Sequence, residues 1–78
     1  MIEVTRTDDG RAELLNPDLI VLVSPSIGGS IVRLLSGRTP VVVNVQESMR
    51  DIADLIAASR RAGGAYARIN ANGDVETV

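Results

Sequence analysis

The stretch MIEVTRTDDGRAELLNPDLI, residues 1–20, decides the fold because two strand patterns in it flank one turn signal. Apolar and polar residues alternate over residues 2–7, as they do in a half-buried strand. Asp8-Asp9-Gly10 has the composition of a hairpin turn. A return strand over residues 11–15 ends at Asn16-Pro17, because proline has no N–H to donate to a β-ladder. The stretch therefore predicts an N-terminal β-hairpin.

The centre of the chain predicts three more strands. Leu19–Val23 is apolar on both faces, which indicates a central strand or one whose outer face meets a partner. We expect a loop at Pro25–Gly29 and a strand at Ser30–Leu35. A turn at Ser36-Gly37-Arg38 leads into the valine-rich strand Val41–Val45.

A helix over residues 25–35 is the alternative for this region. Ser24-Pro25 fits an N-cap followed by proline at the first helical position. Gly28-Gly29 would destabilise the interior of such a helix by about 2 kcal/mol, which favours the strand. With the helix, the chain would form an open α/β layer.

One amphipathic helix is predicted after Ser48, which is an N-cap candidate. Arg60-Arg61 suit the negative end of the helix dipole, and Gly63-Gly64 end the helix. Beyond it, residues 65–78 predict two short strands around an Asn-Gly turn. The expected apolar stripe of the helix consists of Met49, Ile52, Ala53 and Ile56.

Together these elements predict one α+β domain over residues 1–78. Its expected parts are a small, mostly antiparallel β-sheet, built from the N-terminal hairpin and a meander, one amphipathic helix packed on it, and a short C-terminal hairpin. Residues 1–62 form the expected core. Residues 63–78 are an extension that adds an edge hairpin or reaches a neighbouring subunit.

The composition narrows the function. The chain has no Cys and no His, and all eight basic residues are Arg, so thiol, imidazole and lysine chemistry are excluded. A net charge of −2 and a single aromatic residue argue against a nucleic-acid binder. No apolar run is long enough to cross a bilayer, and no signal-peptide pattern is present. We expect a cytoplasmic non-enzyme without cofactor, metal or membrane insertion.

The order of several short motifs resembles the FlbD/SwrD family of flagellar and swarming-motility proteins, over roughly residues 1–61. The resemblance implies a small cytoplasmic non-enzyme that supports motor and stator function by contacting motor components. No catalytic residue comes with the family. A phage or accessory structural protein on the same scaffold is an alternative. The motifs are the start MI-x-VTR, the run Leu15-Asn16-Pro17-Asp18-Leu19-Ile20, the strand ending in Ser36-Gly37, the pair Glu47-Ser48 and the helix ending in Arg60-Arg61.

Three candidate small-molecule sites have plainer structural interpretations. The Ser24–Ser30 loop offers backbone amides for a phosphate but lacks Walker spacing and a lysine. Asp8-Asp9 offers two carboxylates to a hard cation, yet such pairs are ordinary in turns. Asp51 and Asp54 are neighbours on a helix, where a solvated face is the simpler interpretation.

The remaining hypothesis is binding of a protein partner, including a second copy of the chain. Strands that are apolar on both faces leave residues without cover in a monomer. A helix stripe is more often core than docking surface, and dispersed arginines are usually plain surface residues. The candidate partner-binding residues are Leu22, Arg33, Leu35, Val42, Met49, Ile52, Ile56, Arg60 and Arg61, with Arg38 as a further arginine of the same patch.

Overall fold

The N-terminal hairpin is present in the computed structural model, which describes residues 1–78. Strand β1 (Ile2–Thr5) pairs antiparallel with β2 (Ala12–Leu15), and Ile2 lies opposite Leu15. The turn between them closes with an Arg6 N–H that donates to the Arg11 carbonyl at 2.9 Å. The predicted turn is thus confirmed.

The predicted break at Asn16-Pro17 takes the form of one 3-10 turn, η1 (Pro17–Leu19). The Asn16 side chain accepts a hydrogen bond from the Asp18 N–H at 3.0 Å, which caps this turn. Pro17 stands at the start of the turn, where a missing N–H is no loss. The turn carries the chain from the first hairpin into the next sheet.

Strands β3 (Ile20–Ser26), β4 (Gly29–Ser36) and β5 (Thr39–Val45) form an antiparallel meander in that order. Of the two interpretations of Leu19–Val23, the central strand is wrong, because β3 is an edge strand and β4 is central. The expected loop at Pro25–Gly29 is also too long, since β3 continues through Pro25 and only two residues turn the chain. An edge strand tolerates a proline. The alternative helix over residues 25–35 is absent, because strand β4 occupies that region.

Helix α1 (Met49–Arg61) begins at its predicted cap, where Ser48 Oγ accepts a hydrogen bond from the Asp51 N–H at 3.1 Å. Gly63 and Gly64 end it with φ of 70° and 88°. The predicted stripe is partly wrong, because Met49 and Ala53 are exposed. The buried face shares only Ile52 with the predicted stripe. It consists of Ile52, Leu55, Ala58 and Ser59.

The C-terminal strands β6 (Ala67–Ile69) and β7 (Val75–Thr77) form the predicted edge hairpin. Strand β6 pairs parallel with β1, and the Ala67 N–H donates to the Met1 carbonyl at 3.0 Å. The second sheet therefore has the order β2-β1-β6-β7. The expected extension, residues 63–78, therefore contributes two strands to a sheet and one fully buried residue, Ala67, to the core.

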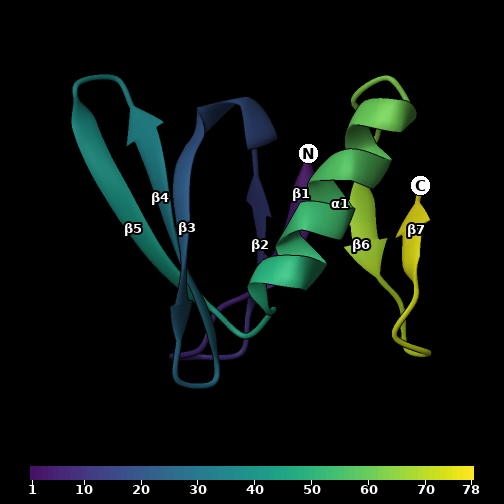
Figure 1. Cartoon of the computed structure of the whole chain (residues 1–78), viewed down its shortest axis with the longest axis horizontal. Coiled ribbons are helices and arrows are strands. Elements are labelled where there is room, and N and C mark those ends of the chain that lie inside the picture. The colour runs from purple at the N-terminus through teal and green to yellow at the C-terminus, as the bar shows by residue number, and fades with distance from the viewer.

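The two sheets meet at the C-terminal end of β1 (Figure 1). Arg6 bridges Val45, and the Gln46 N–H donates to the Thr5 carbonyl at 2.8 Å. The α+β class is confirmed, with two small sheets in place of the single expected sheet. The core lies between both sheets and α1 and contains Ile2, Val4, Leu15, Val32, Leu34, Val43, Val45, Ile52, Leu55, Ala58 and Ala67. No helix of the chain is long and apolar enough to cross a membrane.

Candidate interaction surface

The three-stranded sheet has one face in the core and one in solvent. Along β4, Val32 and Leu34 are buried, while Arg33 and Leu35 between and beyond them are exposed. This alternation follows from the period of two along a strand. We call the solvent side of β3, β4 and β5 the outer face.

The register places three of the candidate partner-binding residues in one row across the outer face. Arg33 of β4 lies opposite Leu22 of β3 on one side and Val42 of β5 on the other. Leu35 belongs to the same face, two residues further along β4. The exposed fractions are 49% for Leu22, 46% for Leu35 and 53% for Val42, so each aliphatic side chain keeps about half its surface in water. The structure thus unites Leu22, Arg33, Leu35 and Val42.

The candidate residues of the helix do not join this surface. Ile52 is 1% exposed and lies in the core, so it offers nothing to a partner, and its assignment as a partner-binding residue is wrong. Ile56 packs against the core, and Met49 remains 44% exposed. Arg60 and Arg61 stand at the C-terminal end of α1, on the core side of the three-stranded sheet. Nine predicted residues therefore divide between two regions.

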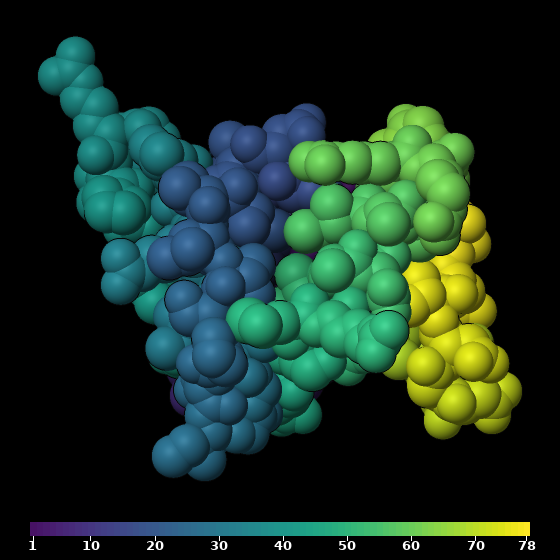
Figure 2. All heavy atoms as spheres, viewed as in Figure 1, coloured from purple at the N-terminus to yellow at the C-terminus, as the bar shows by residue number.

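Arg38 also lies apart from the row, at the tip of the β4–β5 hairpin. Figure 2 shows this tip, in teal at the upper left, standing out from the body of the molecule. Its distance along the hairpin separates Arg38 from the centre of the outer face. The candidate arginines Arg33, Arg38, Arg60 and Arg61 therefore do not form one patch.

An apolar groove of about 300 Å³ is a feature that the sequence analysis missed. It opens between β2 and the β4–β5 hairpin, and Leu35 borders both the groove and the outer face. The consecutive pair Leu14-Leu15 was the available signal, since Leu15 faces the core and Leu14 lies at the rim of the groove with 53% of its surface exposed. The apolar lining consists of Met1, Leu14, Leu15, Leu19, Leu34, Leu35, Val41 and Val43.

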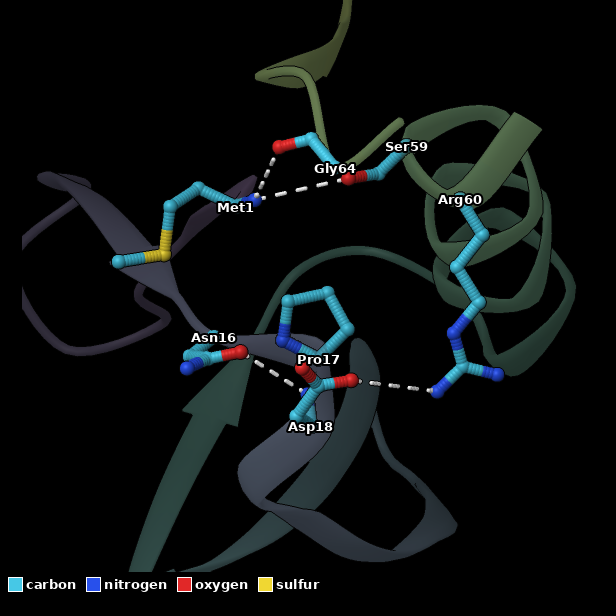
Figure 3. A pocket seen from close by; sticks show the side chains of 7 residues that line it. All are labelled: Met1, Asn16, Pro17, Asp18, Ser59, Arg60 and Gly64. Carbon is cyan, nitrogen blue, oxygen red and sulfur yellow. Dashed lines mark hydrogen bonds and ion pairs between the residues drawn. The ribbon is translucent and has the colours of Figure 1, made fainter. Parts of the chain in front are cut away.

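A second hollow, of about 410 Å³, has Asn16, Asp18, Ser59 and Arg60 among its lining residues (Figure 3). It lies where the start of β1, the turn η1 and the end of α1 come together. Asp18 and Arg60 face each other across it, with 3.8 Å between Oδ1 and Nη2. The Met1 nitrogen donates at 3.5 Å to Ser59 Oγ and to the Gly64 carbonyl. These polar groups pair with one another, so the contacts across the hollow join the start of β1, η1 and the end of α1.

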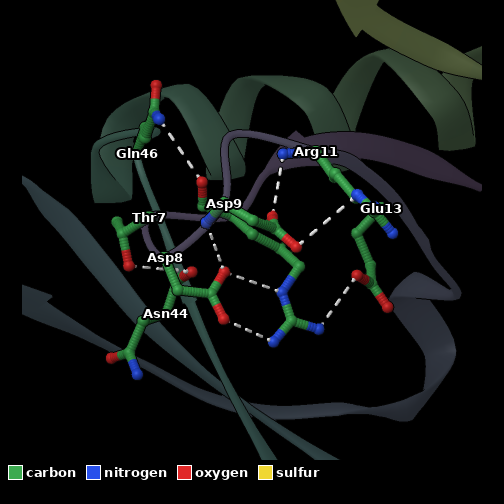
Figure 4. Close-up of polar contacts among 8 residues, drawn as sticks. Thr7, Asp8, Asp9, Arg11, Glu13, Asn44 and Gln46 are labelled. Carbon is green, nitrogen blue, oxygen red and sulfur yellow. Dashed lines mark hydrogen bonds and ion pairs between the residues drawn. The ribbon is translucent and has the colours of Figure 1, made fainter.

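The carboxylates of Asp8 and Asp9 accept hydrogen bonds within the first turn (Figure 4). Arg6 donates to both carboxylate oxygens of Asp8, at 3.1 and 2.9 Å, and reaches Glu13 at 3.4 Å. Asp9 Oδ1 accepts from the Arg11 N–H at 2.9 Å. The hydrogen bonds from Arg6 hold the pKa of the Asp8 carboxyl below its usual value. No group of three or more possible metal ligands gathers anywhere in the chain.

The other two small-molecule candidates are also local structure. The Ser24–Ser30 segment is mostly strand, and Ser30 Oγ donates inward to the Glu47 carbonyl at 2.8 Å. Asp51 supplies the capped N–H of α1, and Asp54 is exposed. Neither segment forms a hollow of its own.

Three residue pairs within the motifs of the flagellar resemblance, Thr5-Arg6, Leu15-Asn16 and Glu47-Ser48, have structural roles. Arg6 pairs with carboxylates around the first turn, and Asn16 caps η1. Glu47 Oε1 accepts a hydrogen bond from the Thr5 N–H at 2.8 Å, and Ser48 caps α1. These motif residues hold the scaffold together. The candidate residues of the outer face, Leu22, Arg33, Leu35 and Val42, lie outside these three pairs.

Comparisons with known proteins add no relative: no protein-family profile matches the chain, and no curated protein and no solved structure matches it. The resemblance to flagellar proteins therefore stays a prediction that depends on the quoted motifs.

Proposed function

We propose that this protein is a non-enzymatic interaction module that binds another protein through its outer face. The observation that carries the proposal is the row Leu22–Arg33–Val42, with Leu35 beside it, on the solvent side of a three-stranded sheet. Aliphatic side chains that keep half their surface in water gain free energy when a partner covers them, at about 25 cal/mol per Å². Exposed aliphatic side chains gathered on one face of a sheet are typical of interaction sites.

The side-chain chemistry supports binding over catalysis. The chain carries no imidazole, thiol or primary side-chain amine to act as general base or nucleophile. Its carboxylates at Asp8, Glu13 and Glu76 are engaged with arginines. The exposed aliphatic residues of the outer face are suited to contact with another protein.

The resemblance to flagellar proteins supports a motility context for this module. We propose a flagellar motor component as the partner and the cytoplasm as the place of contact. A deletion in a motile host that carries the gene tests this part, and swimming speed and swarming are the readouts. Unchanged motility after deletion would remove the motor from the proposal and leave the interaction module.

The outer face itself is tested by a charged substitution in the same host. Val42→Asp should fail to restore swimming to the deletion strain, because the carboxylate would be buried against the partner. Ile27→Asp is the matched control, since Ile27 is fully exposed on the β3–β4 turn and lies off the face. Both purified variants should keep the circular dichroism spectrum of the parent. Full complementation by folded Val42→Asp would contradict the proposal.

Self-association, which the sequence raised as binding of a second copy of the chain, is tested separately. Sedimentation velocity over a range of concentrations measures it directly. A monomer at every concentration would remove self-association and leave binding of a different protein in place.

A further inference from the structure

Arg33 stands alone at the centre of the outer face. Its strand neighbours in the row are both aliphatic, Leu22 and Val42. The five ion pairs of the chain are formed by other arginines, and Arg33 takes part in none of them. The face therefore presents one free guanidinium surrounded by apolar surface.

A partner that covers the aliphatic residues also removes water from Arg33. A guanidinium that is buried without a partner charge strongly opposes binding, because its lost hydration is not replaced. A carboxylate restores that loss most fully, since its two oxygens match two N–H groups of the guanidinium. The position of Arg33 thus selects partners by charge as well as by shape.

The same residue disfavours a second copy of the chain on this face. A two-fold axis through the centre of the row would bring the two Arg33 guanidinium groups together, and like charges at such a contact oppose association.

We infer that the outer face binds a different protein at a surface that carries one Asp or Glu among aliphatic side chains, with that carboxylate on Arg33. This inference rests on the proposed function and names the chemistry of the partner. Leu22, Leu35 and Val42 supply the apolar contact. Arg33 sets the register and rejects partners with a lysine or arginine at the centre.

The experiment uses a phage-displayed library of random peptides, selected on the full chain and counter-selected on Val42→Asp. The peptides recovered should share one acidic residue flanked by aliphatic residues. Selection on Arg33→Glu should enrich lysine or arginine at that position instead. Arg38→Glu is the matched control, because Arg38 is exposed and free of ion pairs but lies at the hairpin tip. It should enrich the same acidic peptides as the parent.

Affinity gives the second readout. Changing the acidic residue of a selected peptide to its amide should raise the Kd for the parent at least about tenfold, and should have little effect on binding to Arg33→Gln. Peptides that need Val42 but show no acidic preference would overturn the inference and leave the proposed function standing. Recovery only of peptides that bind Val42→Asp equally well, or of none, would contradict both.

Discussion

Single residues at the turns of this protein stabilise them through hydrogen bonds to residues close in the chain. Arg6 is the clearest case, because its guanidinium joins Asp8 within the turn to Glu13 on the return strand. The same contacts raise the pKa of Arg6 above its usual value, chiefly through the hydrogen bond to Asp8. One side chain thereby links three parts of the hairpin. This explains how a turn with two adjacent carboxylates is stable.

The Asp8 carboxylate should make stability depend on pH. Its pKa lies below the usual 3.8 in the folded chain, so its contribution is present above that value and is lost as the pH falls through the folded pKa. The Asp8→Asn variant lacks this contribution. We therefore expect urea denaturation to show a smaller loss of stability for Asp8→Asn than for the parent between about pH 5 and about pH 2. Equal losses for the two proteins would contradict the assignment.

Gly29 is required for a close approach between strands. A Cβ at this position would lie 1.9 Å from the backbone carbonyl oxygen of Val45, and that oxygen cannot move without breaking the sheet corner. We expect Gly29→Ala to lower the unfolding free energy by about 3 kcal/mol.

The neighbouring Gly28 is the control for this substitution. It has φ of +82° and open space around its Cβ position, so Gly28→Ala meets only the left-handed backbone penalty of about 1–2 kcal/mol. Chemical denaturation of both variants makes the comparison. A Gly29→Ala protein as stable as Gly28→Ala would show that the close approach is unimportant.

At the scale of elements, α1 shows how the buried face of a helix depends on its neighbours. The period of 3.6 residues predicted the helix and its ends correctly, because capping and the glycine stop are local. Several faces of α1 carry apolar residues, so the period did not determine which one is buried. Contacts with β1, β6 and β7 select the face that contains Leu55.

This assignment of the helix face is tested by one pair of substitutions. Leu55 is fully buried, so Leu55→Ala should lower the unfolding free energy by about 2–5 kcal/mol. Met49 is 44% exposed, and Met49→Ala should change it by about 0.5 kcal/mol or less. Thermal and chemical denaturation measure both. If Met49→Ala is the more damaging, the predicted stripe was the buried face after all.

The strands, like α1, were predictable from local signals, but their positions in the sheets were not. Their existence follows from alternation and from turn residues close in the chain. The edge position of β3 does not, because it depends on whether a further strand pairs along the free side of β3, and β1, β2, β6 and β7 form the other sheet instead.

At the scale of the whole molecule, Glu47 connects the two sheets. Its carboxylate accepts the Thr5 N–H at 2.8 Å, and its carbonyl accepts Ser30 Oγ at 2.8 Å. The acceptors come from the link between β5 and α1, while the donors come from β1 and β4. Glu47 of that link thus adds two hydrogen bonds to the corner where the sheets meet.

Removal of the Glu47 carboxylate should weaken this corner. Glu47→Ala leaves the part-buried Thr5 N–H without an acceptor, and we expect a loss of about 1–3 kcal/mol. Glu47→Gln keeps a side-chain carbonyl oxygen and should lose less. Denaturation measures stability, and amide hydrogen exchange at Thr5 reports the bond itself. Unchanged exchange at Thr5 in Glu47→Ala would show that the bond does not protect the corner.

The sequence by itself determined the elements of this protein, namely the two terminal hairpins, the meander and the capped helix. It did so because turns, caps and periodicity depend on residues close in the chain. Only the tertiary structure decided that β6 pairs parallel with β1, that two sheets enclose the core and that Leu22, Arg33 and Val42 form one row. The physical reason is that pairing and register between strands depend on which apolar faces can be buried together, and that is a property of the whole chain.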